Sequence, residues 1–147
     1  MIRNSISKIS GLDSLKNLEL LILSSNQIKE ITGLENLTNL KELSLARNQL
    51  NKIKNLDNLS NLNILNLEWN NIAKIEGLHN LINLKELHLG YNNISKISGL
   101  ENLHNLEVFY IEGNDIDPNL IKELGGLDSR GRANEPQNFV EYCRTNK

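Results

Sequence analysis

Few residues in this chain of 147 have side chains that could carry out chemistry. There are three histidines, His79, His88 and His104, and one cysteine, Cys143. A zinc site needs several such ligands converging on one point, and a serine nucleophile needs a histidine that is oriented by an acid. No spacing in the sequence brings these groups together on one face. We therefore predict no enzyme, no catalytic residue, no cofactor and no metal site.

Molecular recognition is a second kind of chemistry, and Arg47, Trp69 and Tyr91 are spaced 22 residues apart in a way that suits it. On neighbouring strands these side chains would be close enough for cation–π or edge-on aromatic contacts. Arginine and aromatic anchors on an exposed surface are the usual content of a binding hot spot. In the alternative interpretation they are scattered exposed side chains, with the two aromatic rings shielding the rim of the fold. The predicted partner-binding residues are Arg47, Asn66, Glu68, Trp69, His88, Tyr91, Tyr110 and Glu112.

The spacing of these residues belongs to a repeat that runs through most of the chain. The segment Leu84 to Asn105, LKELHLGYNNISKISGLENLHN, is one 22-residue unit, and near-copies of it precede it. The asparagine of its LGYNNI core recurs once in each unit, at Asn4, Asn26, Asn48, Asn70, Asn92 and Asn114. A fixed period of this length indicates a solenoid, in which successive coils stack in register and each needs its neighbours for stability.

Within the unit, the apolar spacing changes from two residues to three. We number its positions from the leucine that opens each copy, at Leu18, Leu40, Leu62, Leu84 and Leu106. Positions four and six alternate with polar residues, which predicts short parallel strands near 20–24, 42–46, 64–68, 86–90 and 108–112. From position eleven the apolar residues recur every third residue, which suits tight 3₁₀-like turns on the back of the coil. The asparagine at position nine is expected to bond backbone groups that the turn after the strand leaves unpaired.

The pattern resembles the 22-residue class of leucine-rich repeats. The likeness is clearest in ITGLENLTNLKELSLARNQL, residues 31–50, and covers Met1 to about Asp117. That class occurs in the regulatory subunit of type-1 protein phosphatase, an axonemal dynein light chain and bacterial internalins. The resemblance implies an α/β right-handed solenoid with a concave parallel β-sheet and an irregular convex side. It also implies a protein-binding module whose partner could be a phosphatase, a small GTPase or a cytoskeletal protein.

Composition suits one elongated domain with a formal net charge of −2. This balance makes no case for nucleic acid or an acidic membrane as the main partner. No apolar run approaches the roughly 20 residues that a membrane span needs, and the opening MIRNSISKIS lacks the apolar core of a secretory signal. Because Cys143 has no second cysteine to pair with, we expect a reduced, cytoplasmic setting.

The array is expected to begin partway through a repeat, with Met1 at position six and Asn4 at position nine. An uncapped first coil exposes apolar surface and unpaired strand groups. Either another molecule covers this edge or the chain is an excerpt of a longer repeat protein. The alternative function is therefore an assembly or structural element that pairs, or self-associates, through its N-terminal edge.

Regularity stops at Asp117-Pro118, so residues 1–117 are assigned to the repeats and 118–147 to a helical C-terminal cap. Asp117 is expected to cap a first helix that runs to Leu124. A second helix, from Glu135 or Pro136 to Arg144, would have Asn134 as its cap. Its apolar face would cover the last coil. The face consists of Phe139, Val140 and Cys143, and it would lie over Phe109, Ile111 and Ile116.

Overall fold

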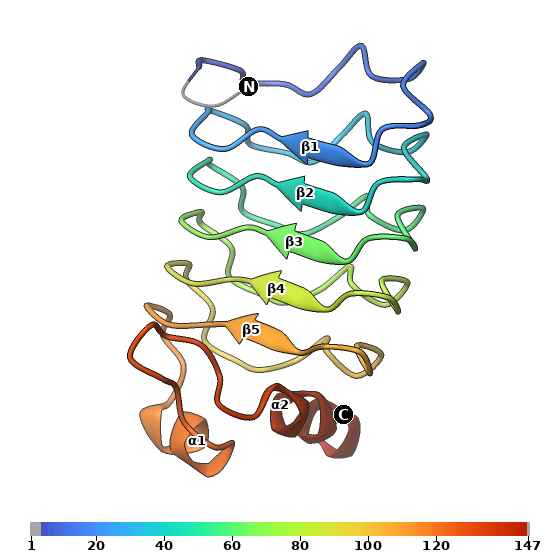
Figure 1. The fold of residues 1–147 in the computed structure, drawn as a ribbon. Coiled ribbons are helices and arrows are strands. Elements are labelled where there is room, and N and C mark those ends of the chain that lie inside the picture. Colours follow the sequence, from blue (N-terminus) through green and yellow to red (C-terminus); the bar gives the residue numbers. More distant parts are fainter. Residues whose placement is uncertain (1–3, 147) are drawn as a thin grey trace.

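The computed structural model describes residues 4–146, which form a five-stranded parallel sheet with its strands in chain order (Figure 1). Neighbouring strands pair with a shift of 22 residues, so that Leu21 lies beside Leu43 and Leu87 beside Phe109. The chain therefore folds as a leucine-rich solenoid with one repeat in each coil, and two helices follow the last coil. The elements are β1 (Leu20–Ile22), β2 (Glu42–Ser44), β3 (Ile64–Asn66), β4 (Glu86–His88), β5 (Val108–Tyr110), α1 (Pro118–Glu123) and α2 (Pro136–Thr145).

Each strand is three residues long and ends two residues before the predicted range. Hydrogen bonding between coils continues past the strands, because the N–H of Leu23 donates to the Ser44 carbonyl and that of Ser25 to the Ala46 carbonyl, both at 2.8 Å. The strand conformation is interrupted at position eight, where φ is 58° at Ser25 and 56° at Arg47. Position eight is thus a left-handed turn that closes the strand, which is uncommon for residues other than glycine.

Apolar side chains at the repeat positions fill the interior of the coils. Leu65, at position four, is fully buried, and Ile111, at position six, is 2% exposed, as inward-facing strand positions require. Behind the sheet the chain forms successive single turns. The N–H of Leu37 donates to the Leu34 carbonyl and that of Leu40 to the Leu37 carbonyl, each at 3.0 Å. These bonds between residues three apart turn every third leucine inward.

The asparagine at position nine joins neighbouring coils. The Nδ2 of Asn70 donates to the carbonyls of Leu45 (3.1 Å), Leu67 (3.0 Å) and Glu68 (3.2 Å), and its Oδ1 accepts from the N–H of Leu50 at 2.9 Å. One amide therefore satisfies four backbone groups, which confirms the structural role predicted for this residue. The equivalent bonds from Nδ2 are made by Asn48, Asn92 and Asn114.

Adjacent coils come very close behind the sheet. At Gly99, where φ is 70°, an added Cβ would lie 2.4 Å from the carbonyl oxygen of Ile75. Asn55 occupies the equivalent place in another coil with φ of 60°, and its Nδ2 donates to the Ile31 carbonyl at 2.7 Å. Asparagine tolerates left-handed backbone better than most residues. Here its side chain also forms a hydrogen bond with the preceding coil, whereas a glycine at this position only lies close to that coil's backbone.

The first coil exposes leucines that are buried elsewhere. Leu15 is 44% exposed, whereas Leu37, at the same repeat position in the next coil, is fully buried. Leu21 is half-buried, whereas its partner Leu43 is fully buried. Met1, to which we assigned position six, lies outside the described residues. Within residues 4–146 the first coil therefore exposes more apolar surface than the coils that follow it.

The cap helices lie below β5 at the other end of the solenoid (Figure 1). The carboxylate of Asp117 caps α1 by accepting from the N–H of Asn119 at 2.9 Å. The prediction that Asn134 caps α2 is wrong. Its amide instead donates to the Gly125 carbonyl at 3.0 Å, which ties the loop back to the end of α1. Glu135 precedes α2 and forms no capping bond through its side chain.

The apolar face of α2 covers the last coil. Phe139, Val140 and Cys143 are all buried, and the ring of Phe139 meets that of Phe109 edge-on, with centroids 5.4 Å apart and planes at 79°. Neither helix in residues 4–146 has the length and the apolar character that crossing a membrane requires.

The segment between the two helices closes the open edge of the sheet. Its residues 131–133 run antiparallel to β5. The N–H of Ala133 donates to the Phe109 carbonyl at 2.8 Å, and the N–H of Ile111 donates to the Gly131 carbonyl at 3.3 Å. An exposed strand edge is a site for unwanted pairing, so this segment completes the cap.

Candidate functional site

The first row of predicted binding residues is Arg47, Trp69 and Tyr91, which we call the turn column. The prediction that they lie on neighbouring strands is wrong, because they lie in the turns that follow β2, β3 and β4, each with φ of 56°. Backbone bonds keep these turns in register. The N–H of Trp69 donates to the Gly90 carbonyl at 3.0 Å and that of Tyr91 to the Glu112 carbonyl at 2.8 Å.

The side chains of the turn column stack on one another. The rings of Trp69 and Tyr91 have centroids 3.9 Å apart and planes at 13°, so they are parallel and not edge-on as one prediction had it. Above the other face of the indole lies the guanidinium of Arg47, with Cζ 4.9 Å from the ring centroid. Trp69 is 43% exposed and Tyr91 38%. These bulky residues thus hold an unfavourable backbone conformation while part of each side chain remains exposed to solvent.

Gly113 makes room for the end of the column. An added Cβ at Gly113 would lie 2.6 Å from Cδ1 of Tyr91, so the phenol ring lies directly against this glycine. Both faces of the indole are covered, by Arg47 on one side and Tyr91 on the other. A partner molecule would therefore meet the edges of the rings and the guanidinium, and not an open ring face.

The second row, which we call the strand patch, consists of Asn66, Glu68, His88, Tyr110 and Glu112. The ring of His88 stacks on that of Tyr110, with centroids 4.6 Å apart and planes at 21°. Its Nδ1 lies 3.7 Å from Oε1 of Glu68, and its Nε2 lies 3.6 Å from Oε2 of Glu86. Asn66 is half-buried, and its Oδ1 accepts from the N–H of Glu68 at 3.1 Å. The imidazole is therefore held by contacts with the coil before it and the coil after it.

Two glutamates connect the strand patch to the turn column. Gly90 lies between them, because its added Cβ would be 3.5 Å from Oε1 of Glu68 and 3.6 Å from Cγ of Glu112. A hydrogen bond to the Glu112 carboxylate, together with the negative charges of Glu112 and Glu68, raises the pKa of the Tyr91 phenol. The carboxyl group of Glu112 also lies against Gly131 in the cap, where no side chain would fit.

The eight predicted residues therefore form one connected surface that spans the second to the fifth coil. Its contents suit recognition, since they are aromatic edges, one guanidinium, one imidazole and two carboxylates. Among residues 4–146, no three His, Cys, Asp or Glu side chains are placed to hold a metal ion together.

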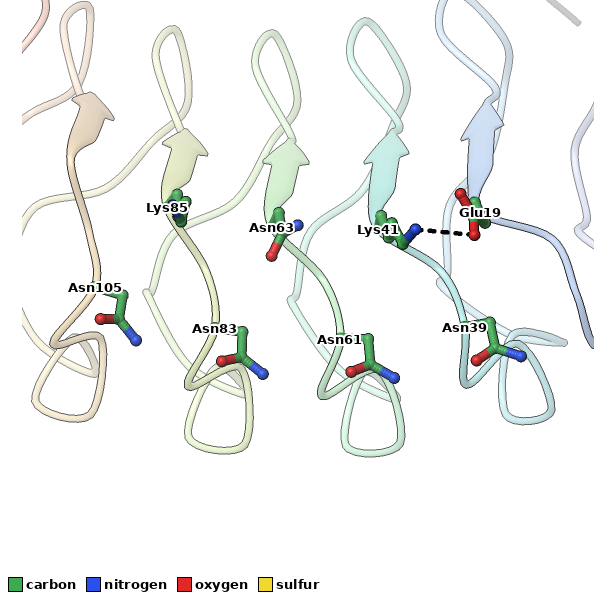
Figure 2. A pocket seen from close by; sticks show the side chains of 8 residues that line it. All are labelled: Glu19, Asn39, Lys41, Asn61, Asn63, Asn83, Lys85 and Asn105. Carbon is green, nitrogen blue, oxygen red and sulfur yellow. Dashed lines mark ion pairs between the residues drawn. The ribbon is translucent and has the colours of Figure 1, made fainter.

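A hollow of about 620 Å³, which was not predicted from the sequence, runs along the edge where the strands begin (Figure 2). We call it the asparagine groove. Its floor is a row of asparagines spaced 22 residues apart, and the same period in the sequence could have revealed it. Asn61 donates from Nδ2 to the Thr38 carbonyl at 2.9 Å, and Asn83 donates to the Ser60 carbonyl at 2.9 Å. The lining residues are Glu19, Asn39, Lys41, Asn61, Asn63, Asn83, Lys85 and Asn105.

Polar groups in the asparagine groove are largely occupied within the chain. Lys41 pairs with Glu19 at 2.9 Å, and Lys85 pairs with Glu107 at 3.5 Å. The amides of the row lie parallel in Figure 2, as expected if each ties its turn to the coil before it. The asparagine groove is thus explained by coil stacking. The turn column and the strand patch remain the stronger candidate for a binding site.

Comparisons with known proteins support the same architecture. Residues 82–129 match the family model for leucine-rich repeats in two copies. The crystal structure of the internalin InlF from Listeria monocytogenes is similar over 82% of this chain, with 34% identity and a TM-score of 0.72. The crystal structure of the internalin C2 (InlC2) from the same bacterium is similar over 73%, with 43% identity and a TM-score of 0.68. A search of curated proteins gave no match.

With its 22-residue period, its sequential parallel sheet and these likenesses, this chain is a leucine-rich-repeat protein. It spans 36% of the InlF structure and 47% of the InlC2 structure, so it corresponds to less than half of either.

Proposed function

We propose that this chain is a non-enzymatic protein-binding module that holds its partner on the sheet side, with the turn column at the centre of the contact. Leucine-rich-repeat domains generally act as protein–protein interaction modules. The observation that carries the assignment of this surface is the exposed stack of Trp69 on Tyr91, with Arg47 above it. Tryptophan, tyrosine and arginine are the residue types most enriched in binding hot spots.

The stack is already ordered before a partner arrives. Coil-to-coil backbone bonds fix the turns of Trp69 and Tyr91, and each ring is held by a neighbour on at least one face. Ordering a side chain during association costs about 0.5–1.5 kcal/mol. Side chains that are ordered in the free protein avoid most of that cost, which favours their use as anchors.

The strand patch gives the surface directional polar contacts. Glu68, His88 and Glu112 lie beside the aromatic rings, and the imidazole is only 19% exposed. Charged groups around an apolar centre steer association and reject wrong partners. We therefore assign the rings the larger share of the binding energy and the strand patch the larger share of specificity.

The test compares wild-type protein with the Trp69→Ala/Tyr91→Ala double variant. Partners captured by cross-linking are identified, and the affinity of each purified partner is then measured for both proteins. Truncating one hot-spot residue costs about 2 kcal/mol or more, and such costs do not simply add, so the double variant should bind a true partner at least about 30-fold more weakly. The matched control is Ile82→Ala, because Ile82 is 52% exposed and lies outside both rows.

A partner that binds the double variant as tightly as wild type would contradict the assignment, provided that the variant unfolds cooperatively. Loss of binding in Ile82→Ala as well would indicate a different surface. The proposal includes a reduced, cytoplasmic setting, because Cys143 is a free thiol on the buried face of α2. Burial raises the pKa of this thiol, which makes it a poor nucleophile at neutral pH.

A second candidate function is self-association through the first coil. It is favoured by a hollow of about 360 Å³ lined only by leucines and an isoleucine, near Leu15 and Leu20, which are 44% and 50% exposed. At the opposite end the cap covers the sheet edge, so two copies would meet first coil to first coil. Light scattering over a range of concentrations tests this. A dimer that Leu15→Lys dissociates would support it, and a strict monomer at high concentration would rule it out.

A further inference from the structure

Three lysines form a row on the side of the solenoid behind the sheet. Lys52, Lys74 and Lys96 occupy position thirteen of three consecutive coils, and all three are exposed. Their coils are held in register nearby, because the N–H of Asn71 donates to the Leu50 carbonyl and that of Asn93 to the Ile72 carbonyl, both at 2.8 Å. We call this row the lysine column.

Two adjoining hollows run along the lysine column. One, of about 170 Å³, lies between Lys52 and Lys74, and the other, of about 430 Å³, lies between Lys74 and Lys96. They share Ala73 and Lys74, so together they make a continuous groove across three coils. Its remaining lining consists of Asn51, Ser95, Ser98 and one acidic residue, Glu76, so the lining carries three positive charges and one negative charge.

The three lysines of the lysine column form no ion pair within the described part of the chain, and with Glu76 as the one carboxylate of the lining the groove keeps a net positive charge. Other lysines have partners there, such as Lys41 with Glu19 and Lys54 with Glu30, but no carboxylate in residues 4–146 lies within ion-pair distance of the three column lysines. Like charges on successive coils repel one another, as like charges on neighbouring strands do. An anion placed along the groove would remove that repulsion and gain attraction from each ammonium group.

We propose that the lysine column binds an acidic, extended segment of a protein, whose carboxylates pair with Lys52, Lys74 and Lys96. This surface is separate from the sheet side, so a partner could use either surface alone or both. Charge complementarity identifies the occupant as anionic. A nucleic acid fits less well, because the groove contains no aromatic side chain for bases to stack on and no arginine, and the chain as a whole carries a net charge of −2.

The test uses fluorescein-labelled decaglutamate as the probe and measures its anisotropy with the full chain at low ionic strength. Lys52→Gln/Lys74→Gln/Lys96→Gln should weaken binding about tenfold, which is the effect of losing three exposed charge pairs. The matched control is Lys16→Gln/Lys41→Gln/Lys85→Gln, which changes the net charge equally but leaves the column intact. Binding to wild type should also decrease as salt is added, because exposed ion pairs are screened.

Three results would overturn the proposal. The first is that the probe does not bind at low salt. The second is that the control variant loses as much affinity for the probe as the lysine-column variant. The third is that an oligothymidylate of equal charge binds more tightly than decaglutamate through the same three lysines. The Trp69→Ala/Tyr91→Ala variant should bind decaglutamate like wild type. Loss of binding in that variant would move the acidic segment to the sheet side and contradict the assignment to the lysine column.

Discussion

The indole of Trp69 and the phenol ring of Tyr91 lie parallel with centroids 3.9 Å apart, although both residues have left-handed backbones with φ of 56°. The two facts have one origin. The left-handed turn repeats every 22 residues and points position eight of each coil in the same direction. The rings therefore stack because the backbone turns are equivalent, and the stacking helps to offset the cost of those turns.

Substitutions at Trp69 should separate the backbone cost from the ring contacts. Trp69→Ala removes the stacking and the cation–π contact, worth about 1–2 kcal/mol together, but keeps a left-handed non-glycine residue. Trp69→Gly loses the same contacts but relieves about 1 kcal/mol of backbone strain. Urea denaturation should therefore show the glycine variant to be the more stable of the two. The opposite order would mean that the turn is not strained.

The phenol of Tyr91 should ionise above its ordinary pKa of 10.0, because its hydroxyl donates a hydrogen bond to the Glu112 carboxylate, whose negative charge also repels the phenolate. A pKa that is raised in the folded state means that this contact stabilises the protein fully below the ordinary value. The stabilisation is then lost as the pH rises through the higher folded-state pKa. Tyrosinate absorbance during alkaline titration measures the shift, with Tyr91→Phe identifying the contribution of Tyr91. Glu112→Gln should lower the pKa, and an unchanged titration in that variant would contradict the contact.

Asn70→Ala should cost about 3 kcal/mol of unfolding free energy, because it leaves buried backbone groups of several residues without partners. The neighbouring Asn71 is exposed, so Asn71→Ala is the matched control and should change stability by less than about 0.5 kcal/mol. Chemical denaturation measures both. Similar small effects at the two positions would show that water replaces the lost amide.

Phe139→Ala should destabilise the protein by about 3–5 kcal/mol, the usual cost of removing a buried aromatic side chain. Phe139 is fully buried and meets Phe109 at the covered end of the sheet. Thermal unfolding should show the loss, and light scattering should show aggregation as the edge of β5 opens. Phe139→Leu keeps most of the apolar contact and should cost less. Soluble, stable Phe139→Ala protein would mean that the antiparallel segment alone closes the edge.

Much of the architecture follows from the period. Because each coil places equivalent residues side by side, the recurrence of Asn70 and Asn92 was enough to predict a solenoid in register and a structural asparagine. It was also enough to bring Trp69 next to Tyr91. Contacts of this kind depend only on the 22-residue repeat, which is visible in the sequence.

Features outside the period were harder to predict. The alternating pattern did not show that each strand ends at position five, or that a left-handed turn follows at position eight, although Gly113 at position eight was a possible signal of that turn. Asn134 followed the usual pattern of a helix cap, but the carbonyl of Gly125 was a partner that only the folded loop brings near. The closure of the sheet by residues 131–133 is a backbone contact of three residues, which is too short to leave a pattern.

The amides of Asn48, Asn70 and Asn92 bond to their own coil and the one before it, so a whole coil could be excised between them without leaving these groups unmatched. Removing residues 48–69 would join Arg47 to Asn70, which has the same role as Asn48. The shortened molecule would keep its fold, but the guanidinium would then sit over the phenol ring of Tyr91 in place of the indole. The number of coils in this protein and the side chains that the coils expose at their surface can therefore vary independently.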